Sequence, residues 1–80
     1  MKHRSRIEIA SVILEVANGG GVTKTRILTG AFLSYNQLQE YLVFLIQKDL
    51  IRYDKDTQTF KTTEKGLRFL QIYNRMHEIL

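Results

Sequence analysis

The apolar residues of this chain follow helical spacing except over residues 50–62. Before residue 50 the spacing is helical, whereas "LIRYD" (50–54) and "QTFKT" (58–62) are short runs rich in residues that favour β-strands. "DKDT" (54–57), where the two runs meet, has the composition of a turn. The pattern predicts a two-stranded hairpin inserted among helices. Because an isolated hairpin is only marginally stable in water, we expect it to pack on those helices through Leu50, Ile51 and Phe60.

Two helices are predicted before residue 30. Apolar residues at helical spacing run over residues 6–18, and Asn18 with the three glycines that follow it ends this helix. Thr23 is the expected N-cap of a short second helix over residues 24–29, which Gly30 ends.

A third and a fourth helix flank the hairpin. Ser34 and Gln37 have the spacing of a capping box, in which each side chain satisfies a backbone N–H near the other residue. The third helix is expected over residues 34–48, and Thr63 is the expected N-cap of a fourth helix over residues 64–80. The predicted buried side of the third helix consists of Leu38, Tyr41, Leu42, Leu45 and Ile46.

The predicted order is therefore helix, helix, helix, hairpin, helix. Only a few residues, from Gly30 to Leu33, join the second and third helices, as in a helix-turn-helix. A hairpin directly after the third helix makes this a winged helix-turn-helix. We predict a mainly α fold with a small β-hairpin (α+β), formed by residues 1–80 as a single domain.

Composition excludes several classes of protein and site. The chain has 80 residues and no cysteine, which excludes disulfides, thiolate metal sites and cysteine nucleophiles. It has no apolar run of about 18 residues, and acidic residues interrupt the N-terminal segment before a signal-peptide core could form. We expect a soluble, cytoplasmic protein with no membrane contact, no metal and no cofactor.

No arrangement of residues points to catalysis. His3 lies in a basic segment and His77 near the C-terminus, and neither has a neighbouring Asp or Ser in a triad-like arrangement. Asp54 and Asp56 alternate on a turn, yet no further ligand follows at calcium-loop spacing. The glycine run follows a helix rather than a strand, so it lacks the setting of a phosphate-binding loop. We expect no enzymatic activity.

The charge of the chain favours an anionic partner only weakly. The net charge is +4, and residues 1–30 contain five lysines and arginines against two glutamates, whereas the remaining residues are nearly balanced. Such a surplus suits a polyanion, and it is equally common on an ordinary protein surface.

The predicted third helix begins with uncharged polar residues where acids are usual. Acidic side chains suit the positive end of the helix dipole, yet Tyr35, Asn36 and Gln37 occupy that place. In a helix-turn-helix this end faces base edges in the major groove, and Asn or Gln amides can pair bidentately with adenine. We predict base contacts from Asn36, Gln39 and Tyr35, with Glu40 facing a base donor or lying off the interface. The alternative is a capping box followed by a solvated face.

Phosphate contacts are expected from helix starts and from basic residues. Free N–H groups at a helix start attract anions, and lysine or arginine neutralises phosphates without reading sequence. We expect loss of Asn36 and Gln39 to reduce sequence preference, and loss of Lys24 and Arg26 to weaken binding to all duplexes alike. The predicted backbone contacts are Thr23, Lys24, Thr25, Arg26, Ser34, Gln37, Arg52, Lys55, Arg4 and Arg6.

The predicted fourth helix is apolar around more of its circumference than one core contact needs. Its second half has little of the domain left to cover it, and exposed apolar surface of this kind usually marks a partner. We predict a C2 homodimer. The predicted interface residues are Ile72, Tyr73, Met76, Ile79 and Leu80.

Several short motifs together resemble one family. With them the chain resembles, over nearly its whole length, the small archaeal winged-helix DNA-binding proteins of the Sulfolobus ten-kilodalton type and the related archaeal winged-helix regulators. The resemblance implies binding to double-stranded DNA and a homodimer in which long fourth helices pair antiparallel, whereas the fourth helix predicted here is shorter. The motifs are Gly21-Val22-Thr23-x-Thr25-x-Ile27, the block from Leu33-x-Tyr35 to Leu42, Leu45, Lys48-Asp49-Leu50-Ile51 and Thr63-Glu64-Lys65-Gly66.

Two classes of function stay open on the sequence. The first is a DNA-binding protein, either a transcriptional regulator or a general nucleoid-associated protein, and the modest net charge favours the regulator. The second is a winged helix that binds another protein, because the fold alone does not choose between the two.

Overall fold

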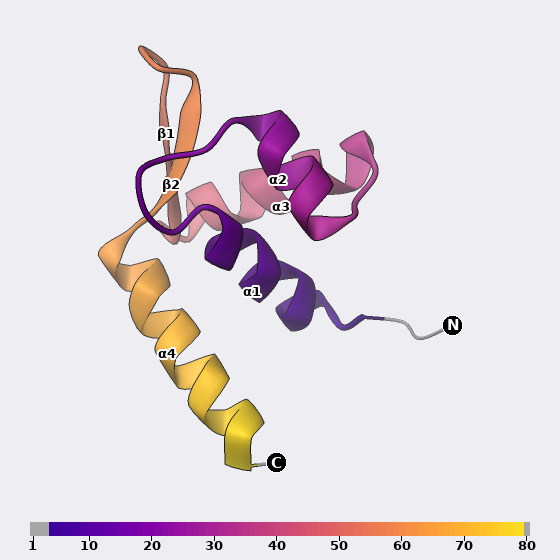
Figure 1. Cartoon of the computed structure of the whole chain (residues 1–80), viewed down its shortest axis with the longest axis vertical. Coiled ribbons are helices and arrows are strands. Elements are labelled where there is room, and N and C mark those ends of the chain that lie inside the picture. Colours follow the sequence, from indigo (N-terminus) through magenta and orange to yellow (C-terminus); the bar gives the residue numbers. More distant parts are fainter. Residues whose placement is uncertain (1–3, 80) are drawn as a thin grey trace.

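The predicted order of elements is confirmed. The computed structural model describes residues 4–79, and Met1, Lys2, His3 and Leu80 lie outside the described part, as does the side chain of Ile79. The four helices and the two-stranded antiparallel hairpin have the α+β composition expected of a winged helix. In chain order they are α1 (Arg6–Val16), α2 (Lys24–Ala31), α3 (Tyr35–Gln47), β1 (Ile51–Asp54), β2 (Thr59–Thr62) and α4 (Glu64–Ile79), as Figure 1 shows.

Side-chain caps fix the starts of the helices where the sequence placed them. The hydroxyl of Ser34 accepts from the backbone N–H of Gln37 at 3.2 Å, and Oε1 of Gln37 accepts from the N–H of Ser34 at 3.0 Å. Thr23 accepts from the N–H of Arg26 at 3.3 Å. Both expected caps are therefore confirmed, and α3 begins with its first N–H groups partly satisfied by its own chain.

The end of α2 differs from the prediction. The helix continues through Gly30 to Ala31, and Phe32 ends it in the left-handed conformation with φ 54° and ψ 49°. Gly30 instead allows a close approach to α1, because a Cβ at this position would lie 3.0 Å from Cγ2 of Val16. The expectation that Gly30 ends the helix was wrong, since the glycine serves helix packing rather than a turn.

The hairpin is docked on the helices by backbone and side-chain hydrogen bonds. Its strands pair in the register Ile51↔Thr62 to Asp54↔Thr59. The hydroxyl of the buried Thr62 donates to the carbonyl of Leu14 at 2.6 Å, and the N–H of Thr62 donates to the carbonyl of Ala17 at 3.0 Å. The hairpin therefore satisfies carbonyls at the C-terminal end of α1 that the helix leaves free.

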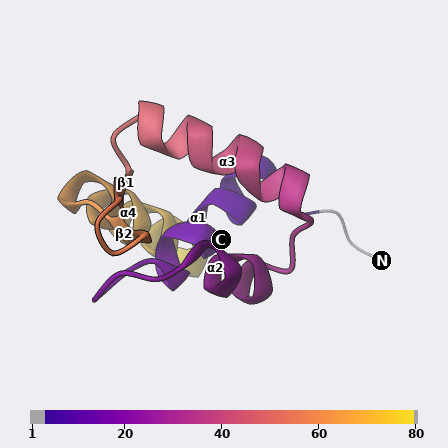
Figure 2. The same cartoon turned by 90° about the horizontal axis from the view of Figure 1, so that it is seen from above.

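The loop between α1 and α2 adds a single residue to the sheet. Val22 and Phe60 exchange two backbone hydrogen bonds, of 2.8 and 2.7 Å. The loop reaches this position with φ of 119° at Gly19 and 93° at Gly21. The first helix ends at Val16, before the predicted end at Asn18, and its cap Ala17 has φ −86°, so the positive φ of the glycines shapes the loop rather than the helix end. Seen from above, the hairpin lies at the C-terminal end of α3, beside the loop that leads into α2 (Figure 2).

The core confirms most of the predicted buried side of α3. Leu38, Leu42 and Leu45 are buried and Tyr41 is half-buried, whereas Ile46 is 43% exposed. The placement of Ile46 in the core was wrong, because this residue lies on the edge of α3 that faces the hairpin across an open groove. The buried hydrophobic core consists of Ala10, Ile13, Leu14, Ala17, Ile27, Ala31, Leu38, Leu42, Leu45, Ile51, Phe60 and Leu70.

The start of α4 is held tightly against the base of the hairpin. A Cβ on Gly66 would overlap the carbonyl oxygen of Leu50 and lie 2.6 Å from Cγ2 of Thr62. Thr63 caps the helix as expected, accepting from the N–H of Gly66 at 3.0 Å. From this anchor α4 runs along α1, and its C-terminal half extends beyond the other elements (Figure 1). Among the described residues, no helix is both long and apolar enough to cross a bilayer.

Candidate nucleic-acid interface

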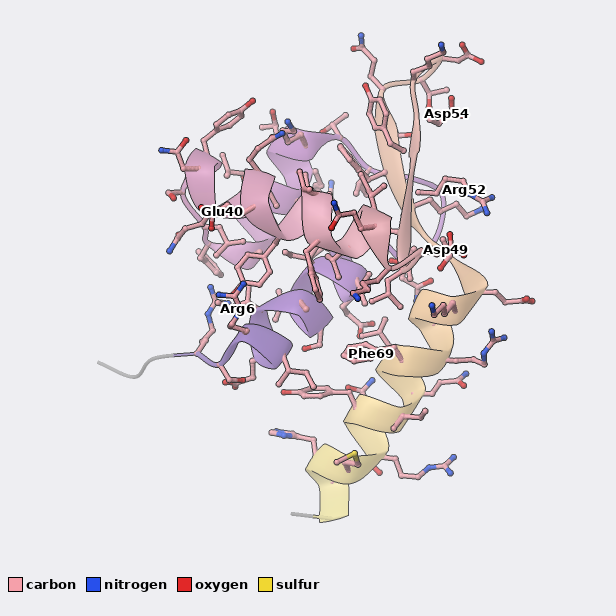
Figure 3. The ribbon with its side chains drawn as sticks, turned by 180° about the vertical axis from the view of Figure 1, so that it is seen from behind. Arg6, Glu40, Asp49, Arg52, Asp54 and Phe69 are labelled. Atoms are coloured by element: carbon pink, nitrogen blue, oxygen red, sulfur yellow. The ribbon has the colours of Figure 1, made fainter. Side chains whose placement is uncertain are left out.

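The first turns of α3 present polar side chains to solvent. Tyr35, Asn36 and Gln39 are exposed, and Tyr35 is 58% exposed despite its ring. Helical spacing carries them away from Leu38, which is fully buried. Glu40 also points outward from α3 (Figure 3). The three residues predicted to contact bases therefore lie together on one accessible face, with a single carboxylate one turn further on.

Lys24 joins this face from the neighbouring helix. Its ammonium donates to Oε1 of Gln39 at 2.7 Å and lies 3.4 Å from the hydroxyl of Tyr35. The same nitrogen is 5.0 Å from the centroid of the Tyr35 ring, which suits a cation–π contact. The structure therefore brings the first residue of α2 next to the exposed face of α3 that carries the predicted base contacts (the predicted reading face: Tyr35, Asn36, Gln39). We call Lys24, Tyr35 and Gln39 the Lys24 cluster.

The other predicted contacts of α2 divide between two sides of the helix. Thr23 and Thr25 line the same groove as Lys24, and Thr23 keeps its cap on α2. Arg26 is exposed but is not among the residues that line this groove. Residues two apart on a helix do not face the same way, so Arg26 and Lys24 occupy different sides of α2.

Ser34 and Gln37 are engaged in the capping box. The hydroxyl of Ser34 accepts from the N–H of Gln37 in α3, and Oε1 of Gln37 accepts from the N–H of the N-cap Ser34. The amide NH₂ of Gln37 and the hydroxyl proton of Ser34 are the groups left to donate to an anion.

The two arginines of the N-terminal segment lie away from the Lys24 cluster. Nη2 of Arg4 donates to the carbonyl of Ala31 at 2.6 Å and so caps the C-terminal end of α2. The guanidinium of Arg6 lies 5.6 Å from the centroid of the Tyr41 ring, on the edge of α3 that faces α1 (Figure 3). Both side chains are therefore used in contacts that tie the N-terminal segment to the helix-turn-helix.

The hairpin places its predicted contacts at separate points. Arg52 is paired with Lys61 across the strands and points away from α3 (Figure 3). Lys55 lies at the exposed tip between Asp54 and Asp56, and Oδ1 of Asp54 accepts from the N–H of Asp56 at 2.9 Å. The tip therefore carries two carboxylates around its one lysine, and one of them stabilises the turn.

An open groove of about 580 Å³ separates α3 from the hairpin and the start of α2. Its walls include Val43, Ile46, Tyr53 and Gln58 beside the Lys24 cluster. Tyr53, Ile46 and Gln58 were not among the predicted site residues. The alternation of β1 could have found Tyr53, because residues two apart on a strand share a face and Ile51 is buried.

Few of the cationic side chains are neutralised within the chain. In the described part of the structure, the salt bridge within 4.0 Å joins Arg68 and Glu64, both exposed and one turn apart on α4. Lys24 instead meets neutral oxygens and an aromatic ring. Its positive charge therefore stays available to an anion beside the reading face. Residues 4–79 show no cluster of three or more side chains able to hold a metal.

The predicted partner surface of α4 is largely exposed. Ile72 is 62% exposed and Met76 is 56% exposed, whereas Tyr73 is half-buried in a stack between Phe69 and His77. These residues and Ile7 of α1 line a shallow groove of about 230 Å³. The predicted contacts of the Ile79 side chain and of Leu80 lie outside the described part.

Comparison with known proteins agrees with this arrangement. A profile of the winged helix-turn-helix family matches residues 3–80. The chain belongs to the winged helix-turn-helix family. Uncharacterized protein MJ0287 of Methanocaldococcus jannaschii is 32% identical to this winged helix over 76 residues, which are 95% of this chain and 73% of that protein.

A solved structure shares the fold. Sso10a-2, a DNA-binding protein from Sulfolobus solfataricus, matches this winged helix with a TM-score of 0.84 at 24% identity, over 95% of this chain and 81% of that chain. The resemblance to small archaeal winged-helix proteins of the Sulfolobus type is therefore confirmed.

Proposed function

We propose that this protein binds double-stranded DNA, with the start of α3 in the major groove. One observation carries the proposal: Tyr35, Asn36 and Gln39 form an exposed, uncharged hydrogen-bonding face, and Lys24 sits beside it with no carboxylate partner among residues 4–79. A helix inserted in the major groove needs donors and acceptors at base edges and cations beside the phosphates. The similar structure of Sso10a-2, a DNA-binding protein, supports the same function.

The proposed roles follow the two kinds of contact. Asn36, Gln39 and Tyr35 face base edges, while Lys24, Arg26, Thr25 and the free donors of Ser34 and Gln37 face phosphates. Lys55 at the hairpin tip reaches a neighbouring phosphate, and Arg52 contributes only through its charge because it points away from α3. Arg4 and Arg6 hold the N-terminal segment in place and add positive charge near the DNA. The function is binding without catalysis.

We further propose that the protein is a transcriptional regulator that works on the chromosome in the cytoplasm. A net charge of +4 is modest for a protein that coats DNA without regard to sequence. The exposed amides of α3 give it the means to choose a site.

The test is binding to a duplex of arbitrary sequence at two salt concentrations. With about three phosphates neutralised by Lys24, Arg26 and Lys55 of each protomer, the affinity should fall roughly 40-fold per bound protomer between about 50 and 200 mM salt. Selection from a random duplex pool should then return a preferred site that is lost in the variant N36A/Q39A. Absence of binding at the lower salt concentration would overturn the proposed function.

One observation favours a second candidate function, binding to another protein. Val43, Phe44 and Ile46, in the second half of α3, are each more than two-fifths exposed. Exposed apolar surface on a helix commonly marks a protein interface. If the protein binds another protein through this surface, I46D should abolish partner binding and N36A should leave it unchanged. If it binds DNA, N36A should lower the affinity for DNA more than I46D does.

We also propose that the protein is a homodimer through α4. The exposed Ile72 and Met76 continue an apolar surface over Phe69 to Ile7 of α1, and this surface has no cover within the described part of the chain. A two-fold contact would bury the same patch on both copies and would present two α3 helices to paired half-sites.

Sedimentation equilibrium tests the dimer. The wild-type mass should be twice the chain mass of 9.4 kDa, and I72D should reduce it to that mass. Q71D is the matched control, because Gln71 is an exposed neighbour on α4 and is not among the groove residues. Equal effects of the two substitutions would contradict a contact through Ile72.

A further inference from the structure

We infer that Lys24 is a positioning residue that fixes the side-chain amide of Gln39, so that Gln39 and Val43 together select thymine. This inference rests on the proposed DNA binding and assigns the base read at one position of the site. It gives Gln39 a different role in base reading from Asn36, although both side chains end in an amide.

The contact with Lys24 determines which end of the Gln39 amide faces the DNA base. An ammonium group has three donors and no acceptor, so only the amide oxygen can lie 2.7 Å from it. The NH₂ of Gln39 must then point the other way, as a donor. Bidentate pairing with adenine needs the oxygen and the NH₂ to face the same base, and the bond from Lys24 occupies one lone pair of the oxygen and holds it toward α2, which disfavours that pairing.

A second interaction keeps Lys24 in this position. Its ammonium lies 5.0 Å from the centroid of the Tyr35 ring, which sits one turn before Gln39 on α3. Tyr35 therefore limits the rotation of the lysine, and the lysine limits the rotation of the amide. Asn36 has no such partner: within the described residues, no side-chain hydrogen bond ties it to the protein. Its amide keeps both ends for a base.

The neighbour of Gln39 on the reading face is apolar. Val43 lies one helical turn further on, is exposed, and lines the same groove. Thymine is the base whose major-groove edge offers an acceptor, O4, next to a methyl group. A fixed donor followed by an exposed valine matches that edge. Guanine offers acceptors without the methyl group. Adenine offers the acceptor N7 beside an NH₂, and cytosine offers an NH₂, so neither presents an acceptor next to a methyl group.

The test compares K24M with R26M by selection from a random pool of duplexes. Both substitutions remove one positive charge from α2, but only Lys24 contacts Gln39. For wild type we expect one position in the selected site to be thymine, preferred over adenine about tenfold. K24M should reduce that preference to about twofold or move it to adenine, whereas R26M should weaken all duplexes and keep the preference.

The methyl group is tested separately, with deoxyuridine in place of the selected thymidine. Loss of the methyl group should weaken wild-type binding about threefold, and V43A should bind the two duplexes equally. Substitution of a thymidine outside the site is the matched control and should have no effect.

The outcomes separate this inference from the proposed function. Wild type that binds duplexes with no preference for thymine, or K24M that keeps the preference, overturns the role of Lys24 and leaves DNA binding standing. Wild type that binds no duplex at low salt overturns both. A V43A variant that still distinguishes thymidine from deoxyuridine overturns the role of Val43.

Discussion

The start of α2, beside the first turns of α3, and the tip of the hairpin each carry a lysine, and the surroundings of the two lysines differ. Lys24 meets a tyrosine ring and an amide oxygen on the reading face, with no carboxylate partner within the described residues. Lys55 extends from an exposed turn between Asp54 and Asp56. A winged helix can contact DNA with either region. Here the charge, the hydrogen-bonding groups and the fixed geometry gather at α2 and α3, so we expect the helices to supply most of the binding energy and the hairpin to supply little.

The largest expected effect concerns Gly66, which lets the start of α4 pack against the base of the hairpin. In G66A the new methyl group meets the carbonyl of Leu50 and the side chain of Thr62, so α4 must move away from the base of the hairpin. We expect the free energy of unfolding to fall by about 3 kcal/mol, which urea denaturation measures. Gly20, where an added Cβ meets nothing within 4 Å, provides the control, and G20A should change stability by less than about 0.5 kcal/mol.

Charge reversal tests the comparison directly. K24E removes a cation beside the reading face and breaks its contacts with Gln39 and Tyr35, so affinity for any duplex should fall about 30-fold at low salt. K55E should lower the affinity about threefold, because the hairpin tip already contains the acids Asp54 and Asp56. Fluorescence anisotropy with a labelled duplex measures both. A larger loss for K55E would mean that the hairpin is the main contact.

Neutralising one acid in each region should again change DNA affinity more at the helices than at the hairpin tip, with smaller effects than charge reversal. Glu40 points outward from α3, so E40Q should tighten binding to all duplexes by about fivefold. D56N on the hairpin tip should change affinity by less than about twofold, because Asp54 stays beside Lys55 and the hairpin supplies little of the binding energy. Equal gains for the two variants would place both acids equally close to the DNA.

The smallest expected effect concerns the connection between α2 and α3. Phe32 adopts φ 54° and is 85% exposed, so it has backbone strain without burial to offset it. F32G should raise the free energy of unfolding by about 0.5 kcal/mol, measured by thermal or urea denaturation. An accompanying loss of DNA affinity would show that the exposed ring itself is part of the interface.

Local features of the fold could be predicted because their causes lie within a few residues. The caps at Thr23 and Ser34 and the hairpin turn depend on side chains that reach a backbone group two or three positions away. The glycine loop depends on the positive φ of Gly19 and Gly21. Gly30 shows the limit of this approach. Its role comes from Val16 on another helix, so a local rule that ends helices at glycine assigned it incorrectly.

The sequence by itself determined the order of elements, the helix starts and the uncharged face of α3, because periodicity and capping are properties of neighbouring residues. Only the tertiary structure decided that Lys24 meets Gln39, that Arg4 caps α2 at Ala31, and that Ile46 faces a groove rather than the core. The first two contacts join residues 15 and 27 positions apart. Such pairs form only after the helices have packed, and their geometry depends on helix orientations that no local pattern encodes.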